Sequence, residues 1–410
     1  MKIPHRFAHP GRFAALAGAL VLVSSPLAAN GTVHVVDDVA GPGVDFTNLQ
    51  DAVDAAASGD LVLVKPGNYL GVDITSSKTL SIVGDVAGGG SASIGLGVQI
   101  TGLASGDRIS FTDLVIGGNG HAVMLNANDG LIQFESCTIT GSGVPIFVPA
   151  DGARVSTCAA VTFVDCAISG SPGAGGDHGL RAFSSSVHLW GCTLTGSQGF
   201  TSSPGGPGAS VSGGFLFASD CTFNGGLGSD GTVSGPFMIC SDGAAGGNGL
   251  TMGSGDPDVV IIDCTFNPAA GGAPGGPACS SGPMGMDVEQ LSGTLETIPH
   301  DARTYEIESP VQVGDMTNLV WQGLPGELCW LVISGGANPV YQPLFQGTAV
   351  PEPAIIIFLG TVPASGVLSV PVNINLNPAK ECAVVFEQGL YFTLPTGFVL
   401  GEPRVGVILQ

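Results

Sequence analysis

The segment VTFVDCAISG (161–170) and its repeats decide the fold. The other copies are VHLWGCTLTG (187–196), LFASDCTFNG (216–225), VVIIDCTFNP (259–268), LIQFESCTITG (131–141) and ISFTDLVIGG (109–118). In each copy, apolar residues alternate with polar ones on both sides of the cysteine, or of Leu114 in the earliest copy. This period of two predicts two short strands with one buried face. The alternation changes phase one residue before the cysteine, at Asp, Ser or Gly, and these residue types accept the left-handed conformation of a sharp bend.

A third short strand precedes each pair, for example at 122–125 and 180–183. We take the cysteine of each copy, or Leu114 in the earliest copy, as its reference position. Successive reference positions lie 23, 29, 26, 29 and 43 residues apart. Three short strands per turn at this period predict a coil of parallel strands. Gly-rich insertions at 198–213 and 225–257 account for the uneven spacing. An ordinary β-sandwich is the alternative, but it gives no reason for the recurrent cysteine segment.

A solenoid needs a cover over its exposed end, and residues 45–58 supply one. Apolar residues at helical spacing predict a capping helix there: Phe46, Leu49, Val53 and Ala56. Thr47 and Gln50 have the form of a capping box, and Gly59 can end the helix. Strands at 61–64 and 79–83 would then begin the coil.

The stretch DFTNLQDAVDAAASGDLVLVKPGNYLGVDITSSKTLSIVGD (45–85) resembles the opening of the right-handed parallel β-helix superfamily, the pectin-lyase-like fold. The resemblance in fold extends over about 45–285 and implies extracellular carbohydrate contact, without implying a reaction. The stretch is also similar to the start of pectin methylesterases, whose G-x-Y-x-E element keeps Gly67 and Tyr69 here but has Gly71 in place of the acid. Later methylesterase elements, and the signatures of pectate lyases and polygalacturonases, are missing.

Composition and charge narrow the class of protein. The 66 Gly and 28 Pro argue against long helices, and 44% hydrophobic residues argue against a disordered chain.

Residues 1–29, with three basic residues before an apolar run, have the layout of a secretory signal peptide, which predicts a secreted or cell-surface protein. Without this segment the net charge falls from −22 to −25. Such a charge excludes nucleic acid as a partner and disfavours an acidic polysaccharide unless metal ions intervene. We expect no transmembrane segment in the mature chain.

After residues 30–290, which form the predicted β-helix, residues 300–410 have the pattern of a small β-sandwich-like domain. Short apolar runs alternate there with Pro, Gly and Asn turns. The segment VPEPAIIIFLG (350–360) is interpreted as a proline turn before a buried strand. A β-helix followed by a short β-rich domain also resembles exported surface proteins of bacteria.

Nine of the ten cysteines fall into two groups, and Cys158 has no obvious partner. Five occupy the same inward position of successive repeats, where parallel side chains suit a disulfide poorly, so we expect packed free thiols: Cys137, Cys166, Cys192, Cys221 and Cys264. Two further pairs are disulfide candidates, Cys240 with Cys279 and Cys329 with Cys382.

The candidate catalytic residues are Asp177, His178 and Arg181, an acid, an imidazole and a cation close together, with His188 nearby. The competing interpretation is a turn before a strand, with an outward-facing arginine. Trp190 is the candidate for stacking on a sugar ring. Asp256 and Asp258 are candidate Ca²⁺ ligands, although Asp-Pro at 256–257 is also a turn signal. We expect no other cofactor.

Two functions remain. The missing enzyme signatures and the long Gly-rich segments favour a non-enzymatic exported β-helix protein with a surface, adhesion or carbohydrate-binding role, whose partner is a polysaccharide or another cell-surface component. The alternative is a polysaccharide lyase or glycoside hydrolase that acts on an extracellular polysaccharide. It depends on analogy of fold and on the Asp177, His178 and Arg181 group.

Overall fold

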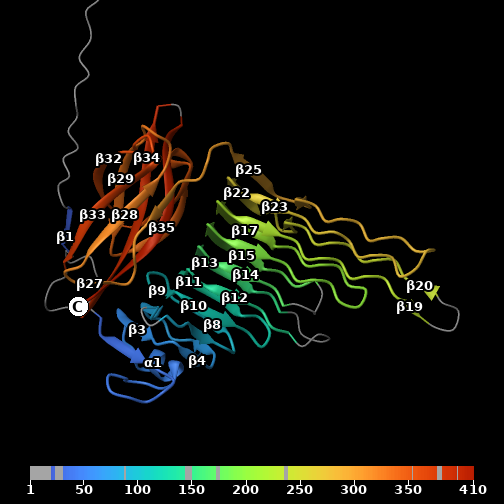
Figure 1. The fold of residues 1–410 in the computed structure, drawn as a ribbon, viewed down its shortest axis with the longest axis horizontal. Coiled ribbons are helices and arrows are strands. Elements are labelled where there is room, and N and C mark those ends of the chain that lie inside the picture. Colours follow the sequence, from blue (N-terminus) through green and yellow to red (C-terminus); the bar gives the residue numbers. More distant parts are fainter. Residues whose placement is uncertain are drawn as a thin grey trace, which may run out of the picture.

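Most of the chain forms a right-handed parallel β-helix, followed by a β-sandwich (Figure 1). The computed structural model describes residues 20–23, 31–86, 89–143, 150–171, 176–234, 239–352, 354–375, 381–394 and 396–410. The predicted signal peptide lies outside the described residues except for β1 (Leu20–Val23), which pairs with a strand of the sandwich. In the described part of the chain, no helix is long and apolar enough to cross a membrane.

Each turn of the β-helix contributes strands to three rows. The first row contains β5 (Val72–Ile74), β8 (Val98–Thr101), the first halves of β11 (Val123–Glu135), β13 (Ala153–Val164), β15 (Leu180–Trp190) and β17 (Ala209–Ser219), then β21 (Leu250–Met252) and β24 (Val288–Gln290). The second contains β2 (Val33–Val36), β3 (Asp60–Val64), β6 (Leu80–Gly84), β9 (Arg108–Thr112), the second halves of those four long strands, β22 (Asp258–Ile262) and β25 (Thr294–Ile298). The third contains β4 (Gly67–Tyr69), β7 (Ala92–Ile94), β10 (Leu114–Gly117), β12 (Thr138–Thr140), β14 (Ala167–Ser169), β16 (Thr193–Thr195), β18 (Thr222–Asn224) and β23 (Thr265–Asn267).

The bend between the second and third rows is the one that the sequence predicts. Each residue before the reference position has φ between 50° and 57°: Asp113, Ser136, Asp165, Gly191, Asp220 and Asp263. The bend between the first and second rows is gentler, so the predicted separate strands run together in β11, β13, β15 and β17. Positive φ values mark it at Ala127, Thr157 and Ser184.

Aligned repeats place like side chains above one another in the core. Phe111, Phe134 and Phe163 form a stack with ring centroids 4.9 and 5.1 Å apart. The cysteine ladder (Cys137, Cys166, Cys192, Cys221 and Cys264) consists of free thiols, as predicted. Each of these thiols lies 3.1–3.3 Å from the carbonyl oxygen two residues earlier, so it donates a weak hydrogen bond along its own bend.

The capping helix is shorter than predicted. Helix α1 (Leu49–Ala55) covers the end of the coil with Leu49, Ala52 and Val53 buried. Asn48, and not Thr47, is its N-cap, because the Asn48 side chain accepts a hydrogen bond from the Gln50 backbone N–H at 3.0 Å. The helix ends at Ala55 with Ala56 as its C-cap, so Gly59, which has φ +99°, does not end it and lies in the turn before β3.

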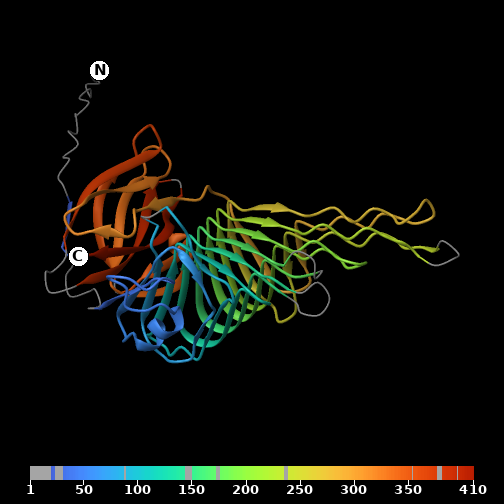
Figure 2. The ribbon, with the colours of Figure 1, turned by 60° about the horizontal axis from the view of Figure 1, so that its bottom comes forward.

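The Gly-rich insertions form a projecting layer that we call the fin: the described residues of 197–208, 225–249 and 267–287 (Figure 2). Neighbouring segments of the fin are joined by backbone hydrogen bonds at every third residue. For example, the N–H groups of Gly225, Gly228 and Gly231 donate to the carbonyl groups of Asn267, Ala270 and Ala273. Three residues per turn is the period of the polyproline II helix. A Cβ on Gly247 would lie 2.0 Å from the Gly206 carbonyl oxygen, so glycine allows this close packing.

A short hairpin, β19 (Val233–Ser234) with β20 (Ile239–Cys240), lies toward the end of the fin, where Cys240 forms the predicted disulfide with Cys279. The second predicted pair is wrong. Cys329 is a free thiol in the sandwich core, whereas Cys382 packs in the interface between the domains, with its sulfur 3.6 Å from the Gly31 carbonyl oxygen.

The sandwich has two sheets. One contains β1, β33 (Val367–Asn375), β28 (Met316–Gln322) and β26 (Thr304–Glu306); the other contains β27 (Val311–Gln312), β35 (Gly397–Leu409), β34 (Cys382–Thr393), β29 (Leu328–Ser334) and β32 (Ile355–Thr361). A hairpin of β30 (Ala337–Gln342) and β31 (Gly347–Pro351), joined by η1 (Pro343–Phe345), completes the domain. The strand expected to be buried after Pro351 is β32, an edge strand with exposed apolar residues.

The sandwich packs against the outward side chains of the second row. Leu131, Val164 and Phe217 of the β-helix meet Val405 and Val407 of β35 there. Arg404 lies between three carboxylates, Glu135 and Asp165 of the β-helix and Glu402 of its own strand. This face of the β-helix is therefore covered, whereas the outward side of the first row remains open.

Candidate functional site

Two arginines lie side by side on the open first row. Arg154 of β13 pairs in register with Arg181 of β15, and Met124 and Gln99 continue the row on β11 and β8. Both arginine side chains are partly exposed and both guanidinium groups approach the Phe183 ring, at 5.7 and 4.8 Å from its centroid. The register of parallel strands thus brings two positive charges and an aromatic ring together.

The other described cations of the β-helix are occupied. Lys65 pairs with Asp85 at 2.6 Å, and Lys78 donates to the carbonyls of Val53 and Ala56 at the end of α1. Arg108 lies over Phe386 in the domain interface. Among the described residues, no carboxylate lies within 4.0 Å of the Arg154 or Arg181 guanidinium. Two adjacent guanidinium groups without a carboxylate partner favour the binding of an anion.

Two imidazoles flank a buried carboxylate at the start of the same row. His121, Asp151 and His178 each stand two residues before the first strand residue of their turn. The Asp151 carboxylate is fully buried and accepts hydrogen bonds from the His178 ring Nδ1 at 2.9 Å and from the His178 backbone N–H at 3.0 Å. His121 Nδ1 lies 3.4 Å from the other carboxylate oxygen.

Protonation follows from these contacts. Burial alone would raise the pKa of Asp151, but the hydrogen bond and charge of His178 outweigh it, so the pKa lies below its usual value and the group is ionised. Burial lowers the pKa of His121, against the attraction of Asp151, so its ring is neutral at pH 7. Arg154 Nη1 lies 3.4 Å from His121 Nε2, which links the imidazoles to the arginine pair.

An open groove of about 430 Å³ adjoins this cluster at His121 and Met124. Its other polar lining residues are Gln50, Asp73, Gln99 and Asn119. The Gln50 side chain bridges α1 to the first row by accepting from the Asp73 N–H at 2.8 Å and donating to the Asp73 carbonyl at 3.0 Å. The groove and the arginine pair form one continuous outer surface, which we call the first-row face: Gln50, Asp73, Gln99, Asn119, His121, Met124, Arg154, His178, Arg181 and Phe183.

The structure brings two of the three sequence candidates to this face. His178 and Arg181 lie on it, but the acid that contacts His178 is Asp151 and not Asp177. Asp177 is buried, and burial raises its pKa. His188 lies under the sandwich between Ser186 and Thr348, where burial lowers its pKa to about 3. Sequence reasoning missed His121, Asp151 and Arg154; aligning the turns on the first strand instead of on the cysteine would have found them.

Trp190 cannot stack on a sugar ring. Its side chain does point outward from the β-helix, but the sandwich covers it and leaves only 2% exposed. Its ring lies 5.4 Å from that of Phe217, within the interface between the domains.

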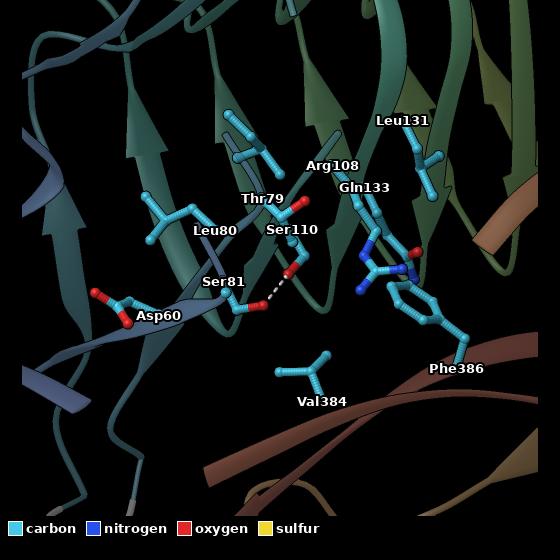
Figure 3. A pocket seen from close by; sticks show the side chains of 12 residues that line it. Asp60, Thr79, Leu80, Ser81, Arg108, Ser110, Leu131, Gln133, Val384 and Phe386 are labelled. Carbon is cyan, nitrogen blue, oxygen red and sulfur yellow. Dashed lines mark hydrogen bonds between the residues drawn. The ribbon is translucent and has the colours of Figure 1, made fainter. Parts of the chain in front are cut away.

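A second cavity lies in the same interface, between the second row and β34 (Figure 3). Ser81 and Ser110 share a hydrogen bond of 2.9 Å there, and Arg108 lies against Phe386. Its volume of about 10 Å³ matches a single water molecule, so it is too small for a substrate.

The calcium candidates do not converge. The Asp256 backbone N–H donates to Ser292 Oγ, and the Asp258 carboxylate accepts from the Thr294 hydroxyl at 2.6 Å. Within the described ranges, no group of three or more His, Cys, Asp or Glu side chains is placed to hold a metal ion. Calcium binding at these two residues stays a prediction.

Comparisons with known proteins give no family. No family model matches the sequence, and no curated protein matches it. Among solved structures, the chain is similar to the full-length tailspike protein 2 of Escherichia coli O157:H7 bacteriophage CAB120, with 9% identity and a TM-score of 0.28. The alignment covers 93% of this chain and 64% of the tailspike chain. At this TM-score the likeness carries no argument, and the resemblance to pectin-lyase-like proteins stays a prediction.

Proposed function

We propose that this is an exported protein that binds an extracellular glycan on the first-row face and does not catalyse a reaction of that glycan. The observation that carries the proposal is the pair Arg154 and Arg181, which lie in register on adjacent turns and have no carboxylate partner among the described residues. Although the chain carries a net charge of −22, two cations lie side by side here. This favours a glycan with an anionic substituent, such as a carboxylate or a sulfate, and no bridging metal ion is then required.

The groove beside the arginine pair supports a saccharide ligand. Its amide, carboxylate and imidazole groups can exchange hydrogen bonds with sugar hydroxyls, and its volume of about 430 Å³ is of the size of small-molecule sites. Phe183 offers an apolar surface next to both guanidinium groups. A chain of sugars lying along the row could place hydroxyls in the groove and an acidic group at the arginines.

Catalysis by paired carboxylates has less support. Glycoside hydrolysis generally uses two accessible carboxyl groups. Asp151 and Asp177 are buried, and of the acids at this face only Asp73 is exposed. The lyase alternative has one observation in its favour, because His121 lies beside Arg154, a cation that could neutralise a carboxylate. The lone pair of His121 Nδ1 already accepts a hydrogen bond from the Asp151 backbone N–H at 3.0 Å, which weakens a role as a base.

The test is a panel of immobilised neutral, uronate-containing and sulfated polysaccharides, with mass spectrometry of the soluble fraction. The proposal predicts retention on acidic polysaccharides and no new oligosaccharide. A product with an unsaturated end group would identify a lyase, a hydrolytic product would identify a glycosidase, and either would overturn binding without turnover.

Variants then locate the site. Arg154→Ala and Arg181→Ala should each weaken binding about tenfold, which corresponds to about 1.4 kcal/mol for one charge-assisted contact. Lys65→Gln is the matched control, because it removes one positive charge from the same domain at a distance from the first-row face. If Lys65→Gln weakens binding as much as the arginine variants, the effect comes from net charge and the site assignment is wrong.

A further inference from the structure

We propose that strand β32 of the sandwich pairs with the same strand of a second copy of this chain and closes a symmetric dimer. This inference is independent of the glycan site, which lies on the β-helix.

Strand β32 is an edge strand whose own protection is limited to one bulge, where Trp330 pairs with Phe358 and Cys329 pairs with Gly360. Among the described strands it pairs only with β29, so its other side presents unpaired N–H and C=O groups. Its sequence, IIIFLGT, contains no charge and no proline. Natural sheets usually protect edges with lysine, proline, bulges or a covering segment. Ile356 and Phe358 are instead 58% and 56% exposed, which indicates that a partner strand covers them.

An aromatic cluster continues this edge over the outer face of the sheet. Trp330 contacts Phe358 and Phe398 at centroid distances of 5.4 and 6.1 Å, and Phe398 also contacts Phe345 and Phe392. The alternate residues of β32, Ile357 and Leu359, pack on the sandwich core. Trp330 and Phe345 also pack on the buried residues Val332, Leu390 and Leu400, whereas Ile356, Phe358 and Phe398 are exposed. Together they form an apolar flank of six residues: Trp330, Phe345, Ile356, Phe358, Phe392 and Phe398.

The distribution of charge favours a second copy of this chain as the partner at the flank. The chain has a net charge of −22, so two copies repel each other over most of their surfaces. The strands that carry the flank have no charged residue in β29, in β32, in 389–393 or in 397–401. Here two acidic copies can meet without opposing like charges.

The geometry of an edge also fits self-association. An antiparallel strand pair is symmetric about a twofold axis, so β32 is complementary to itself and the contact closes at two subunits. The aromatic rings are mutually tilted by 47° to 72°, which gives no flat platform for a sugar ring. The observations therefore favour a protein partner over a saccharide at this surface.

Sedimentation velocity of the purified protein, across micromolar concentrations and at low and high salt, tests the proposal. We expect a species of twice the mass of one chain, and slower amide exchange over Ile355–Thr361 as the concentration rises. Adding negative charge with the double variant Ile356→Glu, Phe358→Glu should weaken dimerisation at least tenfold and leave the circular dichroism unchanged.

The matched control is Leu291→Glu, at a leucine that is 68% exposed on the β-helix and remote from the flank. It should dimerise like the parent. A monomeric parent at all concentrations and salts would overturn the proposal, as would a dimer that persists in the folded double variant. If the parent is monomeric and the double variant no longer binds the glycan, the flank would be assigned to carbohydrate binding instead.

Discussion

Replacing Arg404 with methionine should loosen the contact between the sandwich and the β-helix. The guanidinium lies 2.5 Å from Asp165, 3.1 Å from Glu402 and 3.7 Å from Glu135. The side chains of Glu135 and Glu402 are only 7% and 5% exposed, so removing the cation leaves two buried carboxyl groups without the guanidinium that favours their ionised forms. Breaking such a buried group costs about 3–5 kcal/mol. Asp165 adds little, because its side chain is 39% exposed.

The cost should depend on pH. Burial raises the pKa of Glu135 to about 7, against the attraction of Arg404, and also raises the pKa of Glu402. A carboxyl whose pKa is raised in the folded state favours folding below its unfolded pKa, and this contribution is lost as the pH rises through about 7. In the parent protein, the positive charge of Arg404 stabilises ionised Glu135 and so reduces the loss of stability at high pH. Because Arg404 lowers the pKa of Glu135, the Arg404→Met penalty should be larger near about pH 8 than near about pH 5, where Glu135 holds a proton in both proteins.

Urea unfolding followed by tryptophan fluorescence measures this effect, because Trp190 lies in the interface. Glu135→Gln is the control: its amide oxygen can still accept from the Val405 N–H, which lies 2.9 Å from the Glu135 carboxylate, but it cannot ionise. This variant should be less sensitive to pH than the parent. A penalty for Arg404→Met below about 1 kcal/mol near about pH 8, or an equal penalty at both pH values, would refute the reasoning.

Three further outcomes are expected. Phe163→Ala, in the middle of the phenylalanine stack, should lower the free energy of unfolding by about 3–5 kcal/mol in calorimetry or urea titration, and a loss under about 1 kcal/mol would contradict the packing. Gly247→Ala should speed proteolysis of the fin, because its Cβ would lie 2.0 Å from the Gly206 oxygen, whereas Gly41→Ala, with nothing within 4 Å, should not; equal rates would contradict the close packing. The cysteine ladder should react with a thiol reagent only after unfolding, because its members are buried or nearly so, and rapid labelling of the native protein would show otherwise.

The local signals in the sequence predicted the β-helix well. The phase change before each cysteine, or before Leu114, predicted the positive φ of Asp113, Asp165 and Asp220, because a bend of this kind is decided within a few residues. Helix α1 was found, but its start was misplaced by the choice of Thr47 over Asn48 as the cap. Short apolar runs expected in the domain at 300–410, such as those at 319–321 and 367–372, lie in strands β28 and β33 of the sandwich.

The features that depend on distant contacts were not predictable. Trp190 and His188 point outward from their strand, and only the docking of the sandwich removes them from solvent. The fin has no apolar period, since its order comes from backbone hydrogen bonds between glycine-rich chains. The cluster of His121, Asp151 and His178 depends on the register of three successive turns, which are separated by insertions of different length.

The central claim is that Arg154 and Arg181 together hold an anionic group of a glycan. The most direct test is the affinity for the best acidic polysaccharide of the panel as a function of salt concentration, for the parent and for the Arg154→Ala, Arg181→Ala double variant. The parent should bind less tightly as salt rises, and the double variant should bind weakly with little dependence on salt. Equal affinities and equal salt dependence in the two proteins would contradict the claim.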